Sequence, residues 1–319
     1  MPPMIFLAQM GGWGWVLLLP AIPLVWVVGD YAYSCMVGWN LRRWERAVQR
    51  DADGVRAGCR EFTRGDGPTA LLMIHGFADA PPLFQNFADA LASRGFTCRV
   101  MRLPDSSVPI ADAARVRHVD WLRAVAAELK ALRASHPRVW IVAHSLGCTL
   151  SIEHLLEHPG DIDGLVLIAP LIEVSRRRSP VFPARTWFLI AHRLLHFTQV
   201  AEILFPIDGY TKEARAHRLR DRFISRTIYA EMFDAIAKVV GTAGRITKPL
   251  LMVLSPRDRV IDSRTAARFF EVCAASPKKL IYADRSGHVI PIDADWREVA
   301  DAIVQFIQSA GSNVPPGSR

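Results

Sequence analysis

Residues 142–148, with the sequence VAHSLGC, constrain the fold more than any other part of the chain. They follow the apolar run 139–141, which is typical of a buried strand, and precede an apolar stretch compatible with a helix. A serine on a strained strand-to-helix turn holds its hydroxyl clear of the backbone, and only small residues fit two positions before and after it. Ala143 and Gly147 occupy those positions. The run therefore predicts a nucleophile elbow with Ser145 as the nucleophile.

A second motif lies upstream, where a predicted buried strand, Thr69–Ile74, is followed by the sequence HGFA. A glycine at a strand end lets the backbone turn so that the next N–H points into a pocket. We therefore expect the backbone N–H groups of Phe77 and Leu146 to be the two donors to an oxyanion. The alternative is an ordinary loop with His75 on the surface.

The acid is expected after another predicted strand, Leu250–Leu254. A carboxylate just past a strand end can accept a hydrogen bond from an imidazole and fix its tautomer. Asp258 is the first candidate. Asp262 is the second, although it also suits the N-cap of a helix over Ser263–Val272. Asp284 is a weaker third candidate.

The base is expected on the loop after the last predicted strand, Lys279–Tyr282. His288 follows a glycine there, and an imidazole has a pKa near neutral pH, so it can accept and return a proton. With this residue the order of nucleophile, acid and base along the chain is the one expected of an α/β-hydrolase.

On these motifs the chain resembles α/β-hydrolases of the monoacylglycerol-lipase and carboxylesterase type, over about residues 67–309. The sequence GLVLIAP at 164–170 also resembles the family's strand after the nucleophile helix. Ala143 stands where the family usually has the first glycine of this motif, and Cys148 stands where it often has a second glycine. We expect both differences to affect packing more than chemistry. The chemistry requires no metal or organic cofactor. The resemblance implies catalytic roles for Ser145, His288 and Asp258, with Phe77 and Leu146 as oxyanion donors.

Alternating strand and helix patterns predict an α/β fold with a mostly parallel sheet and helices on both faces. Residues 67–170 and 247–310 are expected to form this core. Residues 40–66 are expected to be a linker with a first strand over Val55–Phe62, and residues 311–319 a disordered tail. Further strands and helices are predicted at 96–103, 83–93, 120–133, 146–156 and 296–309.

Residues 171–246 are too long for a plain loop and predict a helical cap over the active site. Its helices are expected at 187–197, 211–222 and 225–240. Eight apolar cap residues are expected either to line an acyl entrance or to form the cap's own core: Phe188, Leu189, Leu194, Leu195, Phe197, Ile203, Leu204 and Phe205.

The first 29 residues contain no charged side chain, and Met10–Val28 is long enough to cross a bilayer as a helix. We therefore predict a single-pass anchor within residues 1–39. Arginines follow this segment and none precedes it, which places the catalytic domain in the cytoplasm. A cleaved signal peptide, a lipoprotein attached at Cys35 and a helix packed on a soluble enzyme are less favoured alternatives.

The chain carries a net charge of +8, and many of its arginines lie in residues 171–246. No nucleic-acid motif accompanies this charge, so nucleic acid is not an expected partner. Anionic lipid headgroups are one expected contact of the basic cap, and a solvated basic face is the alternative.

The sequence therefore predicts a membrane-anchored serine hydrolase that cleaves carboxylic esters, including monoacylglycerol-like lipids, through a Ser-His-Asp triad and an acyl-enzyme. Amide, thioester or lactone hydrolysis is a related alternative. A dehalogenase is disfavoured because the elbow carries serine in place of aspartate. A non-catalytic binding protein on the same fold is the alternative from another class, and the complete triad argues against it.

Overall fold

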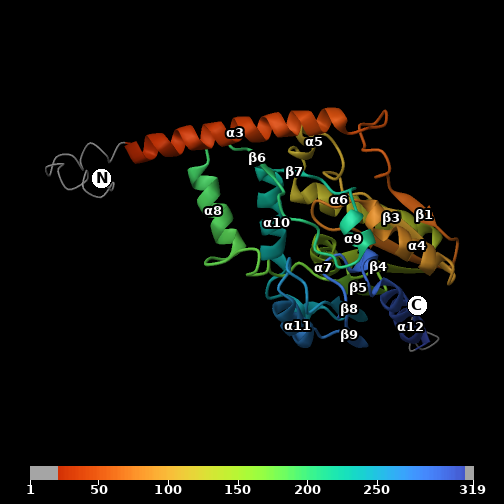
Figure 1. Ribbon diagram of the computed structural model, residues 1–319. Coiled ribbons are helices and arrows are strands. Elements are labelled where there is room, and N and C mark those ends of the chain that lie inside the picture. The colour runs from red at the N-terminus through yellow and green to blue at the C-terminus, as the bar shows by residue number, and fades with distance from the viewer. Residues whose placement is uncertain (1–20, 313–319) are drawn as a thin grey trace.

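The computed structural model describes residues 21–312, which are built around a seven-stranded sheet (Figure 1). β1 pairs antiparallel with its neighbour, and the other neighbouring strands pair parallel. The predicted mostly parallel sheet is confirmed. The strand order is β1 (Phe62–Arg64), β3 (Phe96–Met101), β2 (Thr69–Ile74), β4 (Arg138–His144), β5 (Gly164–Ile168), β8 (Leu250–Leu254) and β9 (Lys278–Tyr282).

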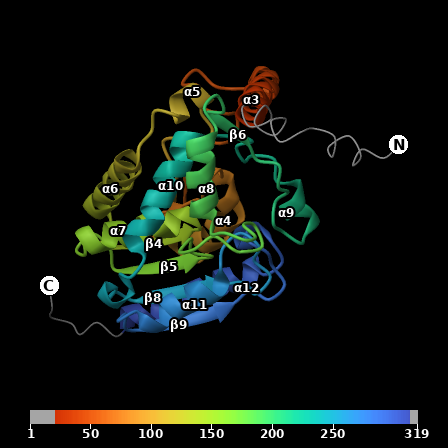
Figure 2. The same ribbon diagram turned by 90° about the vertical axis from the view of Figure 1, so that its left-hand side faces the viewer.

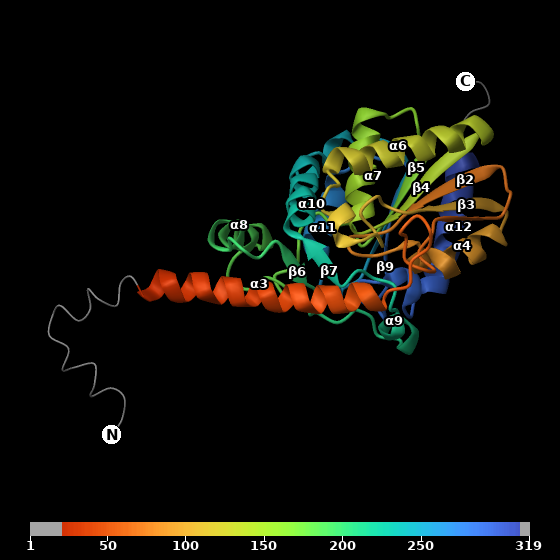
Figure 3. The same cartoon turned by 90° about the horizontal axis from the view of Figure 1, so that it is seen from above.

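Helices cover both faces of this sheet, as predicted. α4 (Gln85–Ala92) and α12 (Trp296–Ser312) lie on one face, and α6 (His118–Ser135) and α7 (Leu146–Glu157) on the other (Figure 3). Because both faces are covered, β2, β5 and β8 are buried along their whole length, which explains their uninterrupted apolar sequences. The other helices described outside residues 171–246 are α5 (Ile110–Ala113), α11 (Ser263–Val272), and the 3-10 turns η1 (Pro81–Phe84) and η3 (Ile290–Ile292), while the 3-10 turn η2 (Ala243–Arg245) lies at the end of that segment.

The long insertion separates β5 from β8, and we call residues 171–246 the cap segment. Its helices α8 and α10 lie side by side (Figure 2), and the Phe188 and Phe233 rings pack at 5.2 Å. Its elements are α8 (Ala184–Leu194), β6 (Val200–Glu202), α9 (Lys212–Ala216), β7 (Phe223–Ser225) and α10 (Arg226–Val239).

The predicted helix over 211–222 is too long, because α9 ends at Ala216. The residues that follow are held away from helical geometry by the core. Asp221 donates its N–H to the carbonyl of Ala78 at 2.9 Å, and the His217 imidazole lies 3.3 Å from the Asp79 carboxylate. Tertiary hydrogen bonds override local helix propensity here.

The N-terminal helix α3 (Ala21–Ala47) runs along the cap segment and projects beyond the core (Figures 1 and 3). Its buried Asp30 accepts hydrogen bonds from the N–H groups of residues 196–198 and from the Thr198 hydroxyl. Burial opposes ionisation of Asp30, but these hydrogen bonds outweigh it and lower its pKa. A charged helix residue thus fixes α3 to the cap segment.

The predicted membrane span, Met10–Val28, lies mostly outside the described residues. Within residues 21–312 no helix is both long and apolar enough to cross a bilayer. The described part of the predicted span forms the start of α3, which continues through Asp30 and across the expected anchor boundary at residue 39. The structure therefore does not support the predicted transmembrane helix in the part of the chain that it describes.

The strand predicted at Val55–Phe62 is wrong except for its last residue. The Asp51 carboxylate accepts the N–H groups of Asp53 and Val55, which folds the chain into turns. Val55 and Cys59 are buried in a small apolar cluster of their own. Their spacing reflects that cluster and not the alternation of a strand.

Candidate active site

Ser145 lies on the turn between β4 and α7 with φ 53° and ψ −116°, a strained conformation for a residue other than glycine. Its N–H donates to the carbonyl of Ile168 at 3.0 Å. Close packing explains the small neighbours. A Cβ on Gly147 would lie 2.3 Å from the Ile74 carbonyl oxygen, and one on Gly76 would lie 2.8 Å from the Ser145 Cβ.

The structure brings Ser145, His288 and Asp258 together in one chain of hydrogen bonds. Asp258 Oδ2 lies 2.8 Å from His288 Nδ1, and His288 Nε2 lies 3.1 Å from Ser145 Oγ. Asp258 Oδ1 accepts the N–H groups of Val260 and Ile261, at 2.7 and 2.9 Å. The carboxylate can accept only from a protonated Nδ1, so Nε2 is left to accept the serine proton.

The two other candidate acids lie elsewhere. Asp262 caps α11, where its carboxylate accepts the N–H of Thr265 at 2.8 Å. Asp284 is exposed, and its carboxylate has no hydrogen-bond partner within residues 21–312. Among the three, only Asp258 meets the His288 ring.

The N–H groups of Phe77 and Leu146 flank the Ser145 turn, and neither donates to a protein acceptor in the described part of the chain. Free N–H groups in this position can stabilise negative charge on an oxygen. His75 is fully buried, not on the surface. Its Nε2 accepts the N–H of Leu103 at 3.1 Å, so its Nδ1 donates to the Gly76 carbonyl at 2.9 Å and stiffens the turn.

His144 lies against His288, with ring centroids 4.7 Å apart. Its Nε2 donates to the backbone carbonyl of His288 at 3.0 Å. Burial and the nearby His288 lower the pKa of His144 to about 4. His144 is thus neutral at neutral pH and adds no positive charge beside an imidazolium.

Two carboxylates that sequence reasoning missed hold the backbone of the loop that carries His288. Asp208, from the cap segment, accepts the N–H of His288 at 3.2 Å and that of Arg259 at 2.8 Å, both on Oδ2. Asp293 accepts the N–H groups of Gly287 and of cap residues 210 and 211. No sequence spacing signals these contacts, because the partners are backbone groups far along the chain.

A third missed residue, Asp221, joins the cap segment to two core loops. Its backbone N–H donates to the Ala78 carbonyl in residues 75–79, which we call the oxyanion turn, and its carboxylate binds the loop after β3. It accepts the N–H of Ser107 at 2.9 Å, and its Oδ1 is buried without a partner. Burial, assisted by the charge of Asp105, raises the pKa of Asp221 to about 7, while the hydrogen bond from Ser107 and the charges of Arg56 and Arg50 oppose the shift.

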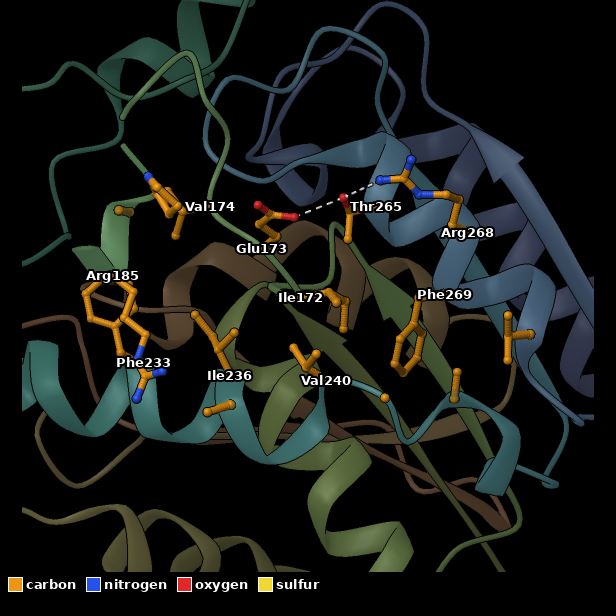
Figure 4. Close-up of a pocket in the computed structure, with 16 residues that line it drawn as sticks. Ile172, Glu173, Val174, Arg185, Phe233, Ile236, Val240, Thr265, Arg268 and Phe269 are labelled. Atoms are coloured by element: carbon orange, nitrogen blue, oxygen red, sulfur yellow. Dashed lines mark hydrogen bonds between the residues drawn. The ribbon is translucent and has the colours of Figure 1, made fainter. Parts of the chain in front are cut away.

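A cavity of about 680 Å³ lies between α8, α10, α11 and the loop after β5 (Figure 4). Phe233, Ile236 and Val240 form its apolar wall, and Glu173, Thr265 and Arg268 are hydrogen-bonded along one rim. Its lining contains no triad residue and none of the eight apolar cap residues considered from the sequence. Several of those eight are largely exposed, so they do not form a cap core either.

The loop after β5 contacts both Ser145 and this cavity. Leu171 donates its N–H to the Ser145 carbonyl at 3.2 Å, and the next residue, Ile172, lines the cavity.

The fold and this constellation define an α/β-hydrolase of the lipase and esterase type. The family described as serine aminopeptidase, S33, matches residues 68–295, and the chain belongs to that family. A thermostable monoacylglycerol lipase of Bacillus sp. (strain H-257) is 24% identical over 79% of this chain and 95% of its own. A carboxylesterase of Bacillus subtilis (strain 168) is 22% identical over 78% of this chain and 96% of its own.

Solved structures agree on the fold. The monoacylglycerol lipase of Paleococcus ferrophilus superposes with a TM-score of 0.67 at 20% identity, over 78% of this chain and 98% of that one. Taken with the family, these relatives place the chain among serine hydrolases that act on ester bonds.

Proposed function

We propose that the protein hydrolyses carboxylic esters with Ser145 as nucleophile, His288 as general base and Asp258 as the acid that orients the base. The hydrogen-bonded path from the Asp258 carboxylate through the His288 ring to the Ser145 hydroxyl carries this proposal. The buried, strained serine turn supports it, because strain that the surrounding structure maintains is typical of functional sites.

The reaction follows from the order of these groups. Ser145 Oγ bonds to the ester carbonyl carbon while its proton passes to His288 Nε2, and the N–H groups of Phe77 and Leu146 stabilise the oxyanion. The carbon–oxygen bond to the alcohol then breaks, and His288 gives its proton to the leaving alkoxide. Water repeats the sequence on the acyl-enzyme, releasing the acid and restoring Ser145.

Monoacylglycerol-like esters are the proposed substrates. The apolar cavity that Ile172 lines could hold the acyl chain of such an ester. The named activity of the Bacillus relative, a monoacylglycerol lipase, supports the same substrate class. We take residues 171–246 as the cap that shapes this cavity.

The decisive experiment is hydrolysis of a p-nitrophenyl ester series from acetate to palmitate by the full chain. Ser145→Ala should lose at least ~10³-fold in kcat, and the chain-length optimum should report the size of the cavity. Matched amide and thioester substrates test the related alternative. A folded enzyme inactive on every ester would refute the proposal. Absence of fluorophosphonate labelling at Ser145 would then favour the non-catalytic alternative.

We further propose that the N-terminal region attaches the enzyme to lipid. Val25 and Val28 of α3 and Leu189 of α8 are at least half exposed, and the Trp26 indole N–H donates to the Leu194 carbonyl at 2.8 Å, joining the two helices. The uncharged sequence before α3 supports the same partner. Co-sedimentation of the full chain with neutral vesicles tests this. Charged substitutions at Val25 and Leu189 should reduce the bound fraction, and equal binding would refute the idea.

A further inference from the structure

A second cavity, of about 520 Å³, is lined in part by later residues of the loop after β5. Four arginines line it, and we call it the arginine pocket. Among residues 21–312 none of the four has a carboxylate within ion-pair distance. They come from three separate chain segments, namely the loop after β5, α9 and the acid loop: Arg177, Arg178, Arg215 and Arg259.

Two of these guanidinium groups are held in place by neighbouring uncharged groups. Arg178 lies over the Phe205 ring at 4.5 Å and donates to the Pro206 carbonyl at 3.4 Å. Arg215 donates through Nε to the Gly209 carbonyl at 3.1 Å, which leaves its two Nη groups free. Burial lowers the pKa of Arg178, and the nearby Asp208 carboxylate opposes this shift. The pocket lining therefore carries four arginines and one carboxylate, which leaves it with an excess of positive charge.

One carboxylate, Asp208, also lines the pocket, but its Oδ2 is occupied by two backbone N–H groups. Those groups belong to Arg259 and to the base, His288. Arg259 directly follows the acid, Asp258. An anion bound in the arginine pocket would therefore lie beside the loops that carry both the acid and the base.

The loop after β5 contributes residues to both cavities. Ile172 and Val174 line the apolar cavity, whereas Arg177 and Arg178 line the arginine pocket. At the start of the same loop, Leu171 is bonded to the Ser145 carbonyl. The chain thus presents an apolar cavity, a nucleophile and a basic pocket along one short segment, an arrangement that suits an amphiphile with an acyl chain, an ester and an anionic head.

We propose that the arginine pocket binds the phosphate of an ester substrate whose alcohol part is phosphorylated, as in an acylglycerol phosphate. Phosphate is favoured because several guanidinium groups can share its charge and its oxygens, each offering paired N–H donors. This inference rests on the proposed ester hydrolysis and names a substrate class within it.

The test compares two soluble substrates, hexanoylglycerol and hexanoylglycerol phosphate, both below their micelle concentrations. The measured quantity is the ratio of kcat/KM for the phosphorylated ester to that for the neutral one, which is independent of the folded fraction. The full-length enzyme should prefer the phosphorylated ester. Arg177→Ser combined with Arg215→Ser should lower the ratio at least ~10-fold, from lost charge-assisted hydrogen bonds. The matched control Arg193→Ser, an exposed change on α8, should leave the ratio unaltered.

The other outcomes separate the two proposals. Hydrolysis of neither ester would overturn the proposed function itself. Hydrolysis of both with an unchanged ratio in the double variant would overturn only the phosphate assignment. Arginine-dependent binding of inorganic phosphate without any substrate preference would identify free phosphate as the occupant. A preference that appears only with anionic vesicles would assign the pocket to a membrane surface, and either result would overturn the substrate assignment.

Discussion

Asp208 offers a test of how the cap segment supports catalysis. A single oxygen, Oδ2, accepts the N–H groups of His288 and Arg259 at 3.2 and 2.8 Å. Replacement by alanine removes the acceptor for both loops. Arg259 is exposed and water can replace its lost bond, whereas His288 is buried and its N–H would lack a partner. Leaving such a group unsatisfied costs ~1–3 kcal/mol.

The unsatisfied N–H destabilises the conformation of the loop in which the His288 ring faces Ser145. At ~1.4 kcal/mol for each factor of ten, kcat/KM for Asp208→Ala should fall about 5- to 150-fold. Asp208→Asn retains an oxygen that can accept both bonds and loses only the charge, so its fall should be less than ~10-fold. The exposed Glu213 lies in the same cap segment, and Glu213→Ala is the matched control.

The assay is steady-state hydrolysis of p-nitrophenyl butyrate from pH 5 to 9, with thermal denaturation of each variant. A positioning role predicts that kcat falls more than KM rises, and that the amide variant restores most of the loss. Wild-type kcat/KM in Asp208→Ala would refute the reasoning. An equal fall in kcat/KM for Asp208→Ala and Asp208→Asn, with both variants as stable as the wild type, would show that the charge of Asp208 supports catalysis and that its two hydrogen bonds do not.

Three further predictions follow from single contacts. Asp258→Asn should lower kcat ~10³- to 10⁴-fold, whereas Asp262→Ala should retain activity and cost ~0.5–2 kcal/mol of unfolding free energy, measured by urea denaturation. Gly76→Ala should abolish ester hydrolysis because its Cβ would lie 2.8 Å from that of the nucleophile, while Gly244→Ala, with open space around it, should not. The pKa of Asp221 is raised to about 7, so the folded protein binds that proton more tightly than the unfolded chain does. The free energy of unfolding should therefore fall as the pH rises from about 4 to about 7. Asp221→Asn should remove that fall, by up to ~4 kcal/mol, and an unchanged pH dependence of urea denaturation would contradict it.

The sheet and the serine turn could be predicted because their signals are local. A buried strand, a small-x-Ser-x-Gly turn and a helix occur in one continuous stretch around Ser145, and the fully buried strands β2, β5 and β8 are largely apolar runs. Both Asp258 and Asp262 follow the same predicted strand, and Asp262 is the second candidate because it also suits the N-cap of a helix over Ser263–Val272. The structure pairs Asp258 with His288 and leaves Asp262 as a cap.

The contacts of the cap segment could not be predicted, because they are made to backbone groups that carry no sequence signature. Asp208 and Asp221 look like ordinary surface carboxylates in the sequence, yet each binds an N–H contributed by a distant core loop. The shortening of α9 has the same origin. Its sequence favours a longer helix, and bonds from His217 and Asp221 to the oxyanion turn stop it.

These contacts divide the cap segment into two mechanically different parts. Lifting residues 207–221 would break the bonds to His288 and to the oxyanion turn, so that part belongs to the catalytic scaffold. α8 has no fully buried side chain, and with Pro183 before it, it supplies one wall of the apolar cavity. The cavity should therefore open by movement of α8, which disturbs no bond to the triad. Asp30 ties α3 to the residues that follow α8. Movement of α3 would therefore shift α8 and change access to the cavity, and would leave Ser145, His288 and Asp258 in place.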